Sequence, residues 1–283
     1  MKKLFKSKPD KIKRVAVLGC GPTGIFAAHA AINMGFDVQL FSRRRRSEMY
    51  GSQYLHAPIP GLTKSPARKI KHILIGKPED YAPKVYGEDH NEPVHSWLTT
   101  DEMAWDIREA YYSGFFKYRD LITDVENISG RTFGSNYPQP HKEVHDAFMD
   151  PHCLLISTIP AHMLCVKMSH NFRSRNILAA GEAFERGVFL DDYNVEKDTV
   201  THNSEKSPSW YRAANIFEHK TIEWPAGTKV FTPHATVIQK VLGTDCDCWE
   251  GAIMKVGRQG SWTRHALAHH AYQQILTALE GSL

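Results

Sequence analysis

The chain has 283 residues, of which 42% are hydrophobic and 23% are charged, and its formal net charge is +4. These values are ordinary for a soluble globular enzyme, and the length suits one large domain or a domain with a sizeable insertion. No apolar run approaches the roughly 18 residues that a membrane-spanning helix needs. The small positive charge suits anionic small molecules as well as nucleic acid.

Cysteine usage and the amino terminus indicate the compartment. Five cysteines, an odd number at irregular spacing, do not form a disulfide framework: Cys20, Cys153, Cys165, Cys246 and Cys248. The basic start "MKKLFKSKPDKIKR" is followed by "VAVLGCG" and not by the apolar region and cleavage site of a signal peptide. We therefore expect a soluble cytoplasmic protein.

The first predicted elements form half of a doubly wound sheet. Residues Val15 to Leu18 are apolar and partly β-branched, which indicates a short buried strand. An alanine-rich helix is expected over Ala27 to Met34, closed by Gly35, and a second strand over Asp37 to Phe41. The order of strand, glycine turn, helix and strand is typical of a Rossmann unit.

The middle of the chain is less regular. Residues 47–95 are rich in Gly, Pro and His and predict long ordered loops. A helix is expected over Thr100 to Phe116, and "HCLLISTIP" (152–160) predicts a second buried strand. Four further segments follow: a polar surface loop over 190–210, an extended strand over 215–224, a candidate strand within 228–241, and an amphipathic helix over 263–280.

The turn after the first strand carries a G-x-G-x-x-G motif. Gly19 permits the tight turn, Gly21 lets the backbone approach a pyrophosphate, and Gly24 lets helix and strand pack closely. The helix amino terminus, with Pro22 and Thr23, presents N–H groups and a partial positive charge to phosphates. These five residues are predicted to bind a dinucleotide; the alternative is a nucleotide-free turn of the same shape.

The end of the second strand leaves the identity of the dinucleotide open. FAD and NAD sites usually have an acid there, whereas this chain has Ser42 followed by arginines from Arg43 to Arg46. Arginine at this place accepts the 2′-phosphate of NADP, so Ser42, Arg43 and Arg44 are candidate cofactor residues. A solvated basic loop is the alternative. On these residues alone, NADP is slightly favoured over FAD.

The carboxyl-terminal stretch "VGRQGSWTRHALAHHAYQQILTALE" shifts the choice of cofactor from NADP towards FAD. It resembles the closing segment of the UDP-galactopyranose mutases, in which Gly-Arg and an aromatic precede a long helix. The resemblance implies that the segment returns to the Rossmann core along a flavin. Gly257 and Arg258 would then lie beside the flavin ring or the pyrophosphate, and Trp262 would take the place of the family's tyrosine.

Two further stretches resemble the same family in the same order. "WYRAANIFEHKTIEWP" matches at Tyr211 and Arg212, and "LLISTIPAHML" resembles the strand that brings the chain back to the flavin. The stretch "GSQYLHAPIPG" also resembles small uncharacterised flavoprotein-like sequences of bacteriophages. The chain departs from the mutases in its shorter length, the missing acid and the single aromatic Trp262.

Other candidate sites are weaker. If the loop after the second strand crosses a flavin, Gln53 and His56 are placed to touch cofactor or substrate. The stretch Asp245-Cys246-Asp247-Cys248 lacks a second ligand pair nearby, so no metal site is expected. No recognised nucleic-acid module surrounds the arginines, so direct nucleic-acid binding is not expected either.

Together these observations predict an α/β fold with a Rossmann-type doubly wound core and a small inserted substrate-covering region. We expect one FAD/NAD(P)-binding domain over 1–283, with its core at about 14–46, 150–165 and 250–283 and inserted regions at about 60–150 and 166–235. FAD is the leading cofactor, and NADP is an alternative or the electron donor. The sequence leaves open whether the protein forms a homo-oligomer.

The predicted function is flavin-dependent redox chemistry on a small anionic molecule. Arg258 and Arg212 would stabilise reduced flavin or bind the anionic substrate, and His56 is the candidate acid or base. Three alternatives are a mutase-like rearrangement of a sugar nucleotide, an NADP-dependent reductase without flavin, and a nucleotide-binding protein without catalysis.

Overall fold

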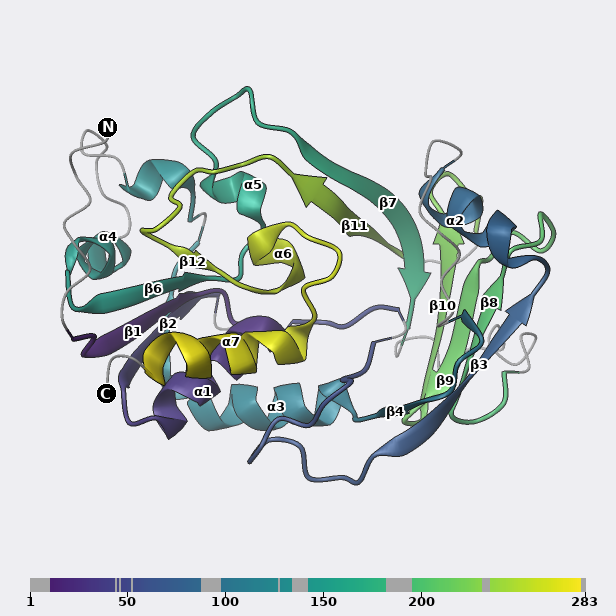
Figure 1. The fold of residues 1–283 in the computed structure, drawn as a ribbon, viewed down its shortest axis with the longest axis horizontal. Coiled ribbons are helices and arrows are strands. Elements are labelled where there is room, and N and C mark those ends of the chain that lie inside the picture. Colours follow the sequence, from purple (N-terminus) through teal and green to yellow (C-terminus); the bar gives the residue numbers. More distant parts are fainter. Residues whose placement is uncertain are drawn as a thin grey trace.

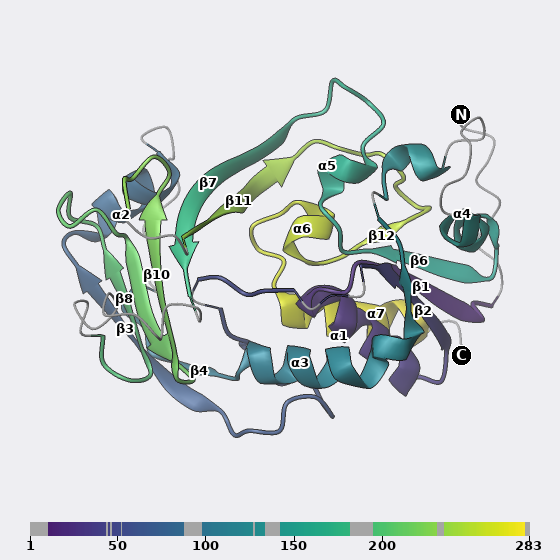
Figure 2. The same ribbon diagram turned by 180° about the vertical axis from the view of Figure 1, so that it is seen from behind.

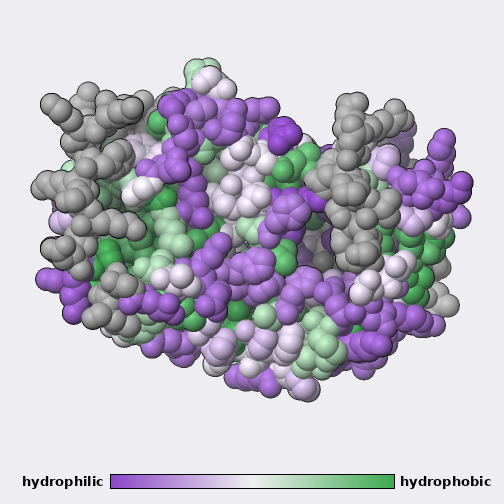
Figure 3. Space-filling view, viewed as in Figure 1, coloured by the Kyte–Doolittle hydropathy of each residue, from purple (hydrophilic) through white to green (hydrophobic). Residues whose placement is uncertain are grey.

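Two sheets divide the molecule into two lobes, which the long strands β7 and β11 connect (Figures 1 and 2). The computed structural model describes residues 11–43, 45, 47–51, 53–87, 98–126, 128–133, 142–181, 195–230 and 235–280. Within these residues no helix is long and apolar enough to cross a membrane. Hydrophilic residues gather over the middle of the face in Figure 3, and its apolar surface is broken into separate patches.

The first lobe contains a parallel sheet of five strands. Their order is β12 (Met254–Lys255), β6 (Cys153–Ser157), β1 (Arg14–Leu18), β2 (Asp37–Ser42) and β5 (Ile122–Asp124). β1 is central, with Val15 beside both Val38 and Leu154. Apolar residues occupy almost all of β1, as expected for a strand covered on both faces.

Helices cover both faces of this sheet. Three lie on one face, where Val15 and Val17 point: α1 (Pro22–Asn33), α3 (Ile107–Tyr118) and α7 (Ala268–Glu280). α7 packs there through Ala271 and two further residues at four-residue spacing, Ile275 and Leu279. On the other face, Ala16 and Leu18 pack in one cluster with α4 (Lys142–Met149). The layers are those of a doubly wound fold.

The second lobe is a mixed sheet of seven strands. Their order is β11 (Thr236–Thr244), β7 (Phe172–Ala180), β10 (His219–Pro225), β9 (Arg212–Ile216), β8 (Thr199–Asn203), β3 (Arg68–Ile75) and β4 (Glu102–Ala104). β3 pairs with β8 in parallel, and the other neighbours are antiparallel. Helix α2 (Pro78–Tyr86) packs on this sheet through Tyr81 and Val85.

Short helices occupy several connections: α5 (Ala161–Leu164), α6 (Gly257–Ser261), and the 3-10 turns η2 (Arg119–Leu121) and η3 (Gly130–Phe133). α6 begins where the chain leaves β12, and α7 follows it. The predicted helix over 263–280 therefore begins later, at Ala268.

The predicted Rossmann elements are confirmed, and the middle of the chain differs. The range 47–95, expected to be loops, contains β3 and α2, and β8 lies in the predicted surface loop over 190–210. The helix expected from Thr100 starts at Ile107 because the side chain of Asp106 accepts the Arg108 N–H at 2.7 Å. β4 occupies the residues before it.

The range 215–224, expected to be a single strand, contains the end of β9, a tight turn and most of β10, which together form a hairpin. Phe217 and Glu218 turn with φ of 52° and 61°, and β9 and β10 pair on either side. The range 60–150, assigned to an inserted region, also contributes to the Rossmann lobe. β5 pairs with β2 there, and α3 packs against α1. The lobes therefore exchange chain segments more often than the sequence indicates.

Candidate cofactor and substrate site

The glycine turn joins β1 to α1 at the carboxyl edge of the parallel sheet. Gly19 has φ +102°, and its N–H donates to the Phe41 carbonyl at 2.9 Å. A Cβ at Gly24 would lie 1.9 Å from the Gly19 carbonyl oxygen, and a Cβ at Gly19 would lie 2.5 Å from Oγ1 of Thr158. The fold itself therefore requires glycine at positions 19 and 24.

Gly21 is different, because nothing in the fold requires it to be glycine. Its φ of −69° is ordinary, and a Cβ there would approach only Oγ of Ser47, at 3.7 Å. Gly21 precedes α1, which begins with Pro22 and has no side-chain cap. Gly21 therefore leaves the first N–H groups of α1 without a side-chain cap, which is the usual state of a phosphate-binding helix terminus.

A cavity of about 600 Å³ lies beside this turn. Its lining residues come from the ends of β1 and β2 and from the segments that follow β2, β5 and β6: Cys20, Phe41, Ser42, Arg43, Arg45, Ser47, Glu48, Tyr50, Val125, Ile128, Ile159 and Met163. Open α/β sheets bind ligands outside the carboxyl ends of their strands. The cavity has this position.

The charges in the cavity differ from the sequence expectation in one respect. Arg43 lines it, with Nε 3.3 Å from Oε1 of Glu126, and both side chains are exposed. Arg44 lies outside the described residues. Glu48 also lines the cavity and accepts a hydrogen bond from the Tyr50 hydroxyl. An acid is therefore present six residues beyond Ser42, where a search confined to the strand end misses it.

The carboxyl-terminal segment returns to this turn. Gly257 has φ +71°, and a Cβ there would lie 2.3 Å from Cγ2 of Thr23. A Cβ at Gly260 would lie 2.3 Å from the Ser157 carbonyl oxygen. The two glycines bring α6 against the first turn of α1 and the end of β6.

Trp262 packs away from the turn. Its side chain is 1% exposed, it contacts the rings of Phe172 and His162, and its Nε1–H donates to the Arg173 carbonyl at 3.2 Å. The fold gives Trp262 a packing role, and its predicted contact with a cofactor stays a prediction.

A buried cluster of charges lies on the mixed sheet. Glu223 on β10 is fully buried and accepts from Nε of Arg212 on β9 at 3.0 Å. Nζ of Lys240 on β11 lies 3.3 Å from its other oxygen, to which the Tyr211 hydroxyl also donates. A Cβ at Gly51 would lie 2.5 Å from Oε1 of Glu223, so the loop after β2 crosses directly over this carboxylate.

The electrostatics of this cluster bring Arg258 into it. Burial alone would raise the pKa of Glu223, but the charges of Arg212 and Lys240 hold it well below its ordinary value. Burial lowers the pKa of Lys240 to about 8 against the opposing attraction of Glu223. Arg258 on α6 is exposed by its surface area, but desolvation and then the charge of Arg212 lower its pKa, so it lies within electrostatic reach of the cluster. The three cations carry more charge than Glu223 offsets, which suits an anionic ligand.

Comparisons with known proteins identify the fold. No protein-family model and no curated protein matches the chain. CtdE, solved in complex with FAD and a substrate, superposes with a TM-score of 0.52 at 12% identity, over 95% of this chain and 80% of its own. The 2,6-dihydroxypyridine-3-hydroxylase of Arthrobacter nicotinovorans gives 0.51 at 12% identity, over 97% and 84%. The chain has the fold of the FAD/NAD(P)-binding Rossmann flavoproteins. Reduced UDP-galactopyranose mutase is also similar, with a TM-score of 0.47 at 10% identity over 95% of each chain.

On this flavoprotein fold, a chain of hydrogen-bonding groups leads from His56 into the mixed sheet. Nδ1 of His56 lies 2.6 Å from one oxygen of Glu102, and Nε2 of His72 lies 3.2 Å from the other. Nδ1 of His72 lies 3.0 Å from Nε2 of His202, whose Nδ1 lies 3.1 Å from the Tyr81 hydroxyl. His56 is exposed, whereas His72, His202 and Tyr81 are buried. This series of hydrogen-bonding groups therefore connects solvent with the interior.

This hydrogen-bonded chain ends close to the charge cluster. Burial, and then the charges of Arg212 and His72, lower the pKa of His202 well below its ordinary value. At Glu102 burial acts to raise the pKa, but hydrogen bonds from His56, His72 and Tyr54 hold it well below its ordinary value. Glu102 is thus the partner of His56 that sequence reasoning could not place.

The remaining predicted residue, Gln53, stabilises its own loop. Its side-chain nitrogen donates to the Tyr50 carbonyl at 2.7 Å. The structure therefore gives Gln53 a loop contact, and its contact with a cofactor or substrate stays a prediction.

His269 gives a first test of the electrostatics around His56, since their ring centroids are 5.6 Å apart. Burial, with the charges of His270 and His56, lowers its pKa to about 4. Its folded pKa is below its unfolded value of about 6.5, so this group makes folding less favourable as the pH falls from about 6.5 to 4. An NMR titration of the imidazoles, in which the His269 signal is assigned by its loss in His269→Gln, should give a midpoint near pH 4 for this residue. A midpoint near 6.5 would contradict the burial.

Proposed function

We propose that the chain binds FAD and is an oxidoreductase acting on a small anionic substrate. The observation that carries the proposal is the glycine turn with the uncapped start of α1 beside a 600 Å³ cavity. CtdE, a chain of the same fold, was solved in complex with FAD, which supports the choice of cofactor.

The residues of the turn fit a dinucleotide. Gly21 leaves open the space that a Cβ would fill, and the first N–H groups of α1 are donors for a pyrophosphate. Glu48 is an acceptor for ribose hydroxyls in place of the acid missing after β2. Gly257 and Arg258 would complete the site from the returning segment.

The substrate would be bound by the cluster on the mixed sheet. FAD supplies electron or hydride transfer when it is bound. Arg212, Lys240 and Arg258 would hold a carboxylate or phosphate of the substrate, and would favour negative charge developing beside them. The hydrogen-bonded chain from His56 to Tyr81 would carry a proton between solvent and this cluster.

The visible spectrum of the purified protein tests the proposal. We expect a flavin spectrum, with about one FAD per chain after excess FAD is added and unbound FAD is removed. NADPH or a chemical reductant should then bleach the flavin absorption. Repeated reduction of the bound flavin and its reoxidation by an acceptor would separate an oxidoreductase from a binding protein without turnover. A mutase-like enzyme would instead turn over its substrate with no net consumption of a reductant or an acceptor.

A colourless protein that does not retain FAD would contradict the proposal. In that case NADPH binding should be measured, because Arg43 and Arg45 line the cavity and are suited to a 2′-phosphate. NADPH affinity that falls in Arg43→Ala and Arg45→Ala would then identify an NADP-binding protein without flavin.

A further inference from the structure

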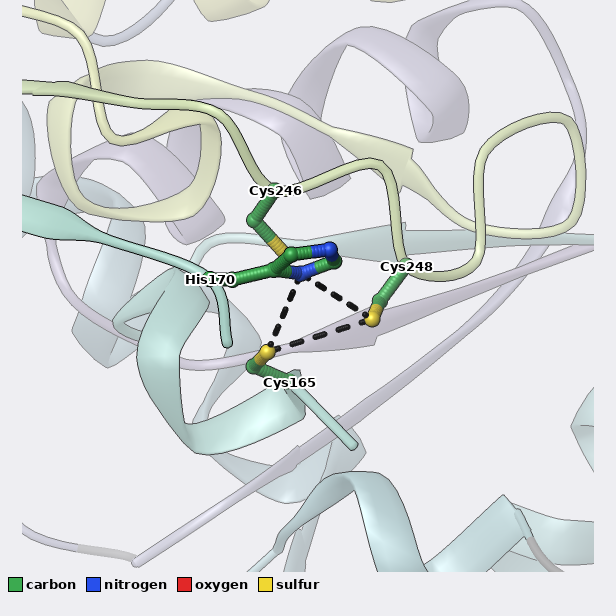
Figure 4. Close-up of side chains that lie close together, drawn as sticks. All are labelled: Cys165, His170, Cys246 and Cys248. Carbon is green, nitrogen blue, oxygen red and sulfur yellow. Dashed lines mark hydrogen bonds between the residues drawn. The ribbon is translucent and has the colours of Figure 1, made fainter. Parts of the chain in front are cut away.

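Three cysteines and one histidine from two distant parts of the chain meet at the junction of the lobes (Figure 4). Cys165 directly follows α5, and His170 precedes β7. Cys246 and Cys248 follow β11. The three sulfur atoms and a nitrogen of His170 all lie within 4.8 Å of one another.

The distances among Cys165, His170 and Cys248 match three edges of a tetrahedron around a single ion, and the sulfur of Cys246 lies within 4.8 Å of all three. Zinc binds sulfur at about 2.3 Å and imidazole nitrogen at about 2.0–2.1 Å, so tetrahedral geometry separates two sulfurs by about 3.8 Å and a sulfur from a nitrogen by about 3.5 Å. Sγ of Cys165 lies 3.8 Å from Sγ of Cys248. Nδ1 of His170 lies 3.4 Å from the first of these sulfurs and 3.6 Å from the second.

The orientation of His170 provides an independent observation. Its Nδ1 points to the sulfurs of Cys165 and Cys248 (Figure 4), and its Nε2 lies 3.3 Å from Oδ1 of Asp247. Histidines that bind metals usually donate their other N–H to a carboxylate or a carbonyl, which fixes the tautomer and the ring. Asp247 is itself held by Nζ of Lys167 at 2.9 Å.

Hydrogen bonds between the two connections hold the cysteines in place. The Asn171 N–H donates to Oδ1 of Asp245 at 2.8 Å, and Oγ1 of Thr244 donates to the Asn171 carbonyl at 2.7 Å. Nε1 of Trp249 donates to the Leu164 carbonyl at 2.8 Å, next to Cys165. The backbone around the cluster is therefore ordered by contacts other than the sulfurs themselves.

We propose that Cys165, His170, Cys246 and Cys248 bind one Zn²⁺ as a structural site. A set of three thiolates and one imidazole, all from the protein, completes the tetrahedron and leaves no position open for substrate. The sequence alone favours no metal, because the C-x-C pair has no second pair nearby. The fold supplies the missing ligands from about 80 residues earlier, through the pairing of β7 with β11.

Two other uses of the cysteines fit the geometry less well. A disulfide between Cys165 and Cys248 would leave Cys246 and His170 without a role, and all five cysteines are free thiols. An iron–sulfur cluster takes four cysteines in its usual form and spreads them around several iron atoms, which separates the sulfurs further than here.

The position in the fold indicates what the zinc would stabilise. One connection leads from β6 through α5 to β7, and the other leads from β11 to β12. β6 and β12 are neighbours in the parallel sheet, and β7 and β11 are neighbours in the mixed sheet. The zinc would join these two of the crossings between the lobes at one point, and this role does not depend on a flavin.

The metal content of the intact protein tests the proposal directly. The chain is purified under reducing conditions without chelators, and its metals are measured by plasma mass spectrometry. We expect about one zinc per chain, and replacement by Co²⁺ should give the absorption of a tetrahedral thiolate site. Wild-type protein that is reduced, given Zn²⁺, gel-filtered and found free of zinc would overturn the proposal.

Matched cysteine variants locate the zinc. Cys246→Ser and Cys248→Ser should lose most of the zinc, while Cys153→Ser on β6 should retain about one per chain. Zinc retained in full by both ligand variants would overturn the assignment. If these variants do not fold, the zinc content and Co²⁺ spectrum of the wild-type protein and of Cys153→Ser decide the question.

Discussion

Replacing Glu223 with glutamine should reduce the free energy of unfolding by about 3–5 kcal/mol, the range measured when one partner of a buried ion pair is removed. The carboxylate is fully buried and receives Arg212, Lys240 and the Tyr211 hydroxyl. Glutamine keeps the size and one acceptor oxygen but leaves the two cations without their negative partner. Their mutual repulsion then adds to the cost of burying them.

Chemical denaturation of the wild-type protein and two variants measures this effect. Glu218→Gln is the matched control, because Glu218 pairs with Arg68 and Lys197 but its side chain is 61% exposed. Exposed pairs contribute about 0–1 kcal/mol, so the control should remain close to wild type. Equal effects of the two substitutions would show that Glu223 does not neutralise a buried charge.

The pH dependence of the same experiment follows from the depressed pKa of Glu223. A group whose folded pKa lies below its unfolded value stabilises the fold above the unfolded pKa of about 4.3 and loses this contribution as the pH falls. Glutamine cannot titrate. The difference between wild type and Glu223→Gln should therefore shrink below about pH 4.3, and a difference that is constant with pH would contradict the ionised state of Glu223.

The Rossmann half could be predicted from sequence because its signals are local. Gly24 is required by its contact with the Gly19 carbonyl within one strand, turn and helix, Gly19 has a positive φ in the same turn, and the buried strand over 153–157 is short and apolar. The mixed sheet gives no such signal. β3 and β8 pair across more than 120 residues, and their polar side chains conceal the strand pattern.

The candidate site was predicted only in part for the same reason. Arg212 and Arg258 are identifiable one at a time, whereas Glu223 and Lys240 acquire their roles from strand pairing. Glu102 was expected in the first turn of a helix, but it lies on β4 and contacts two histidines. Such side chains carry no local pattern that separates them from ordinary surface residues.

Gly21→Ala should weaken FAD binding and Gly24→Ala should lower the stability of the fold, and this pair tests the proposed cofactor site most sharply. At Gly21 the backbone conformation is open to alanine and the new methyl group would meet only Ser47, at 3.7 Å. Loss of glycine at a helix N-cap costs on the order of 1 kcal/mol or less, so the melting temperature should change little. The methyl group would nevertheless occupy the approach of the pyrophosphate. Overpacking costs about 1–3 kcal/mol, which weakens FAD binding by roughly 5- to 150-fold.

At Gly24 the same methyl group would lie 1.9 Å from the Gly19 carbonyl oxygen, which is backbone and cannot rotate away. Alanine stabilises a helix by about 1 kcal/mol relative to glycine. Relieving the clash requires α1 to move away from the turn, and this overpacking costs more, close to the upper end of about 1–3 kcal/mol. Gly24→Ala should therefore lower the stability with or without FAD. Isothermal titration with FAD and thermal unfolding of both variants separate the two effects. Undiminished FAD affinity in Gly21→Ala would place the pyrophosphate elsewhere, whereas equal loss of stability in both variants would show that Gly21, too, is required by the fold.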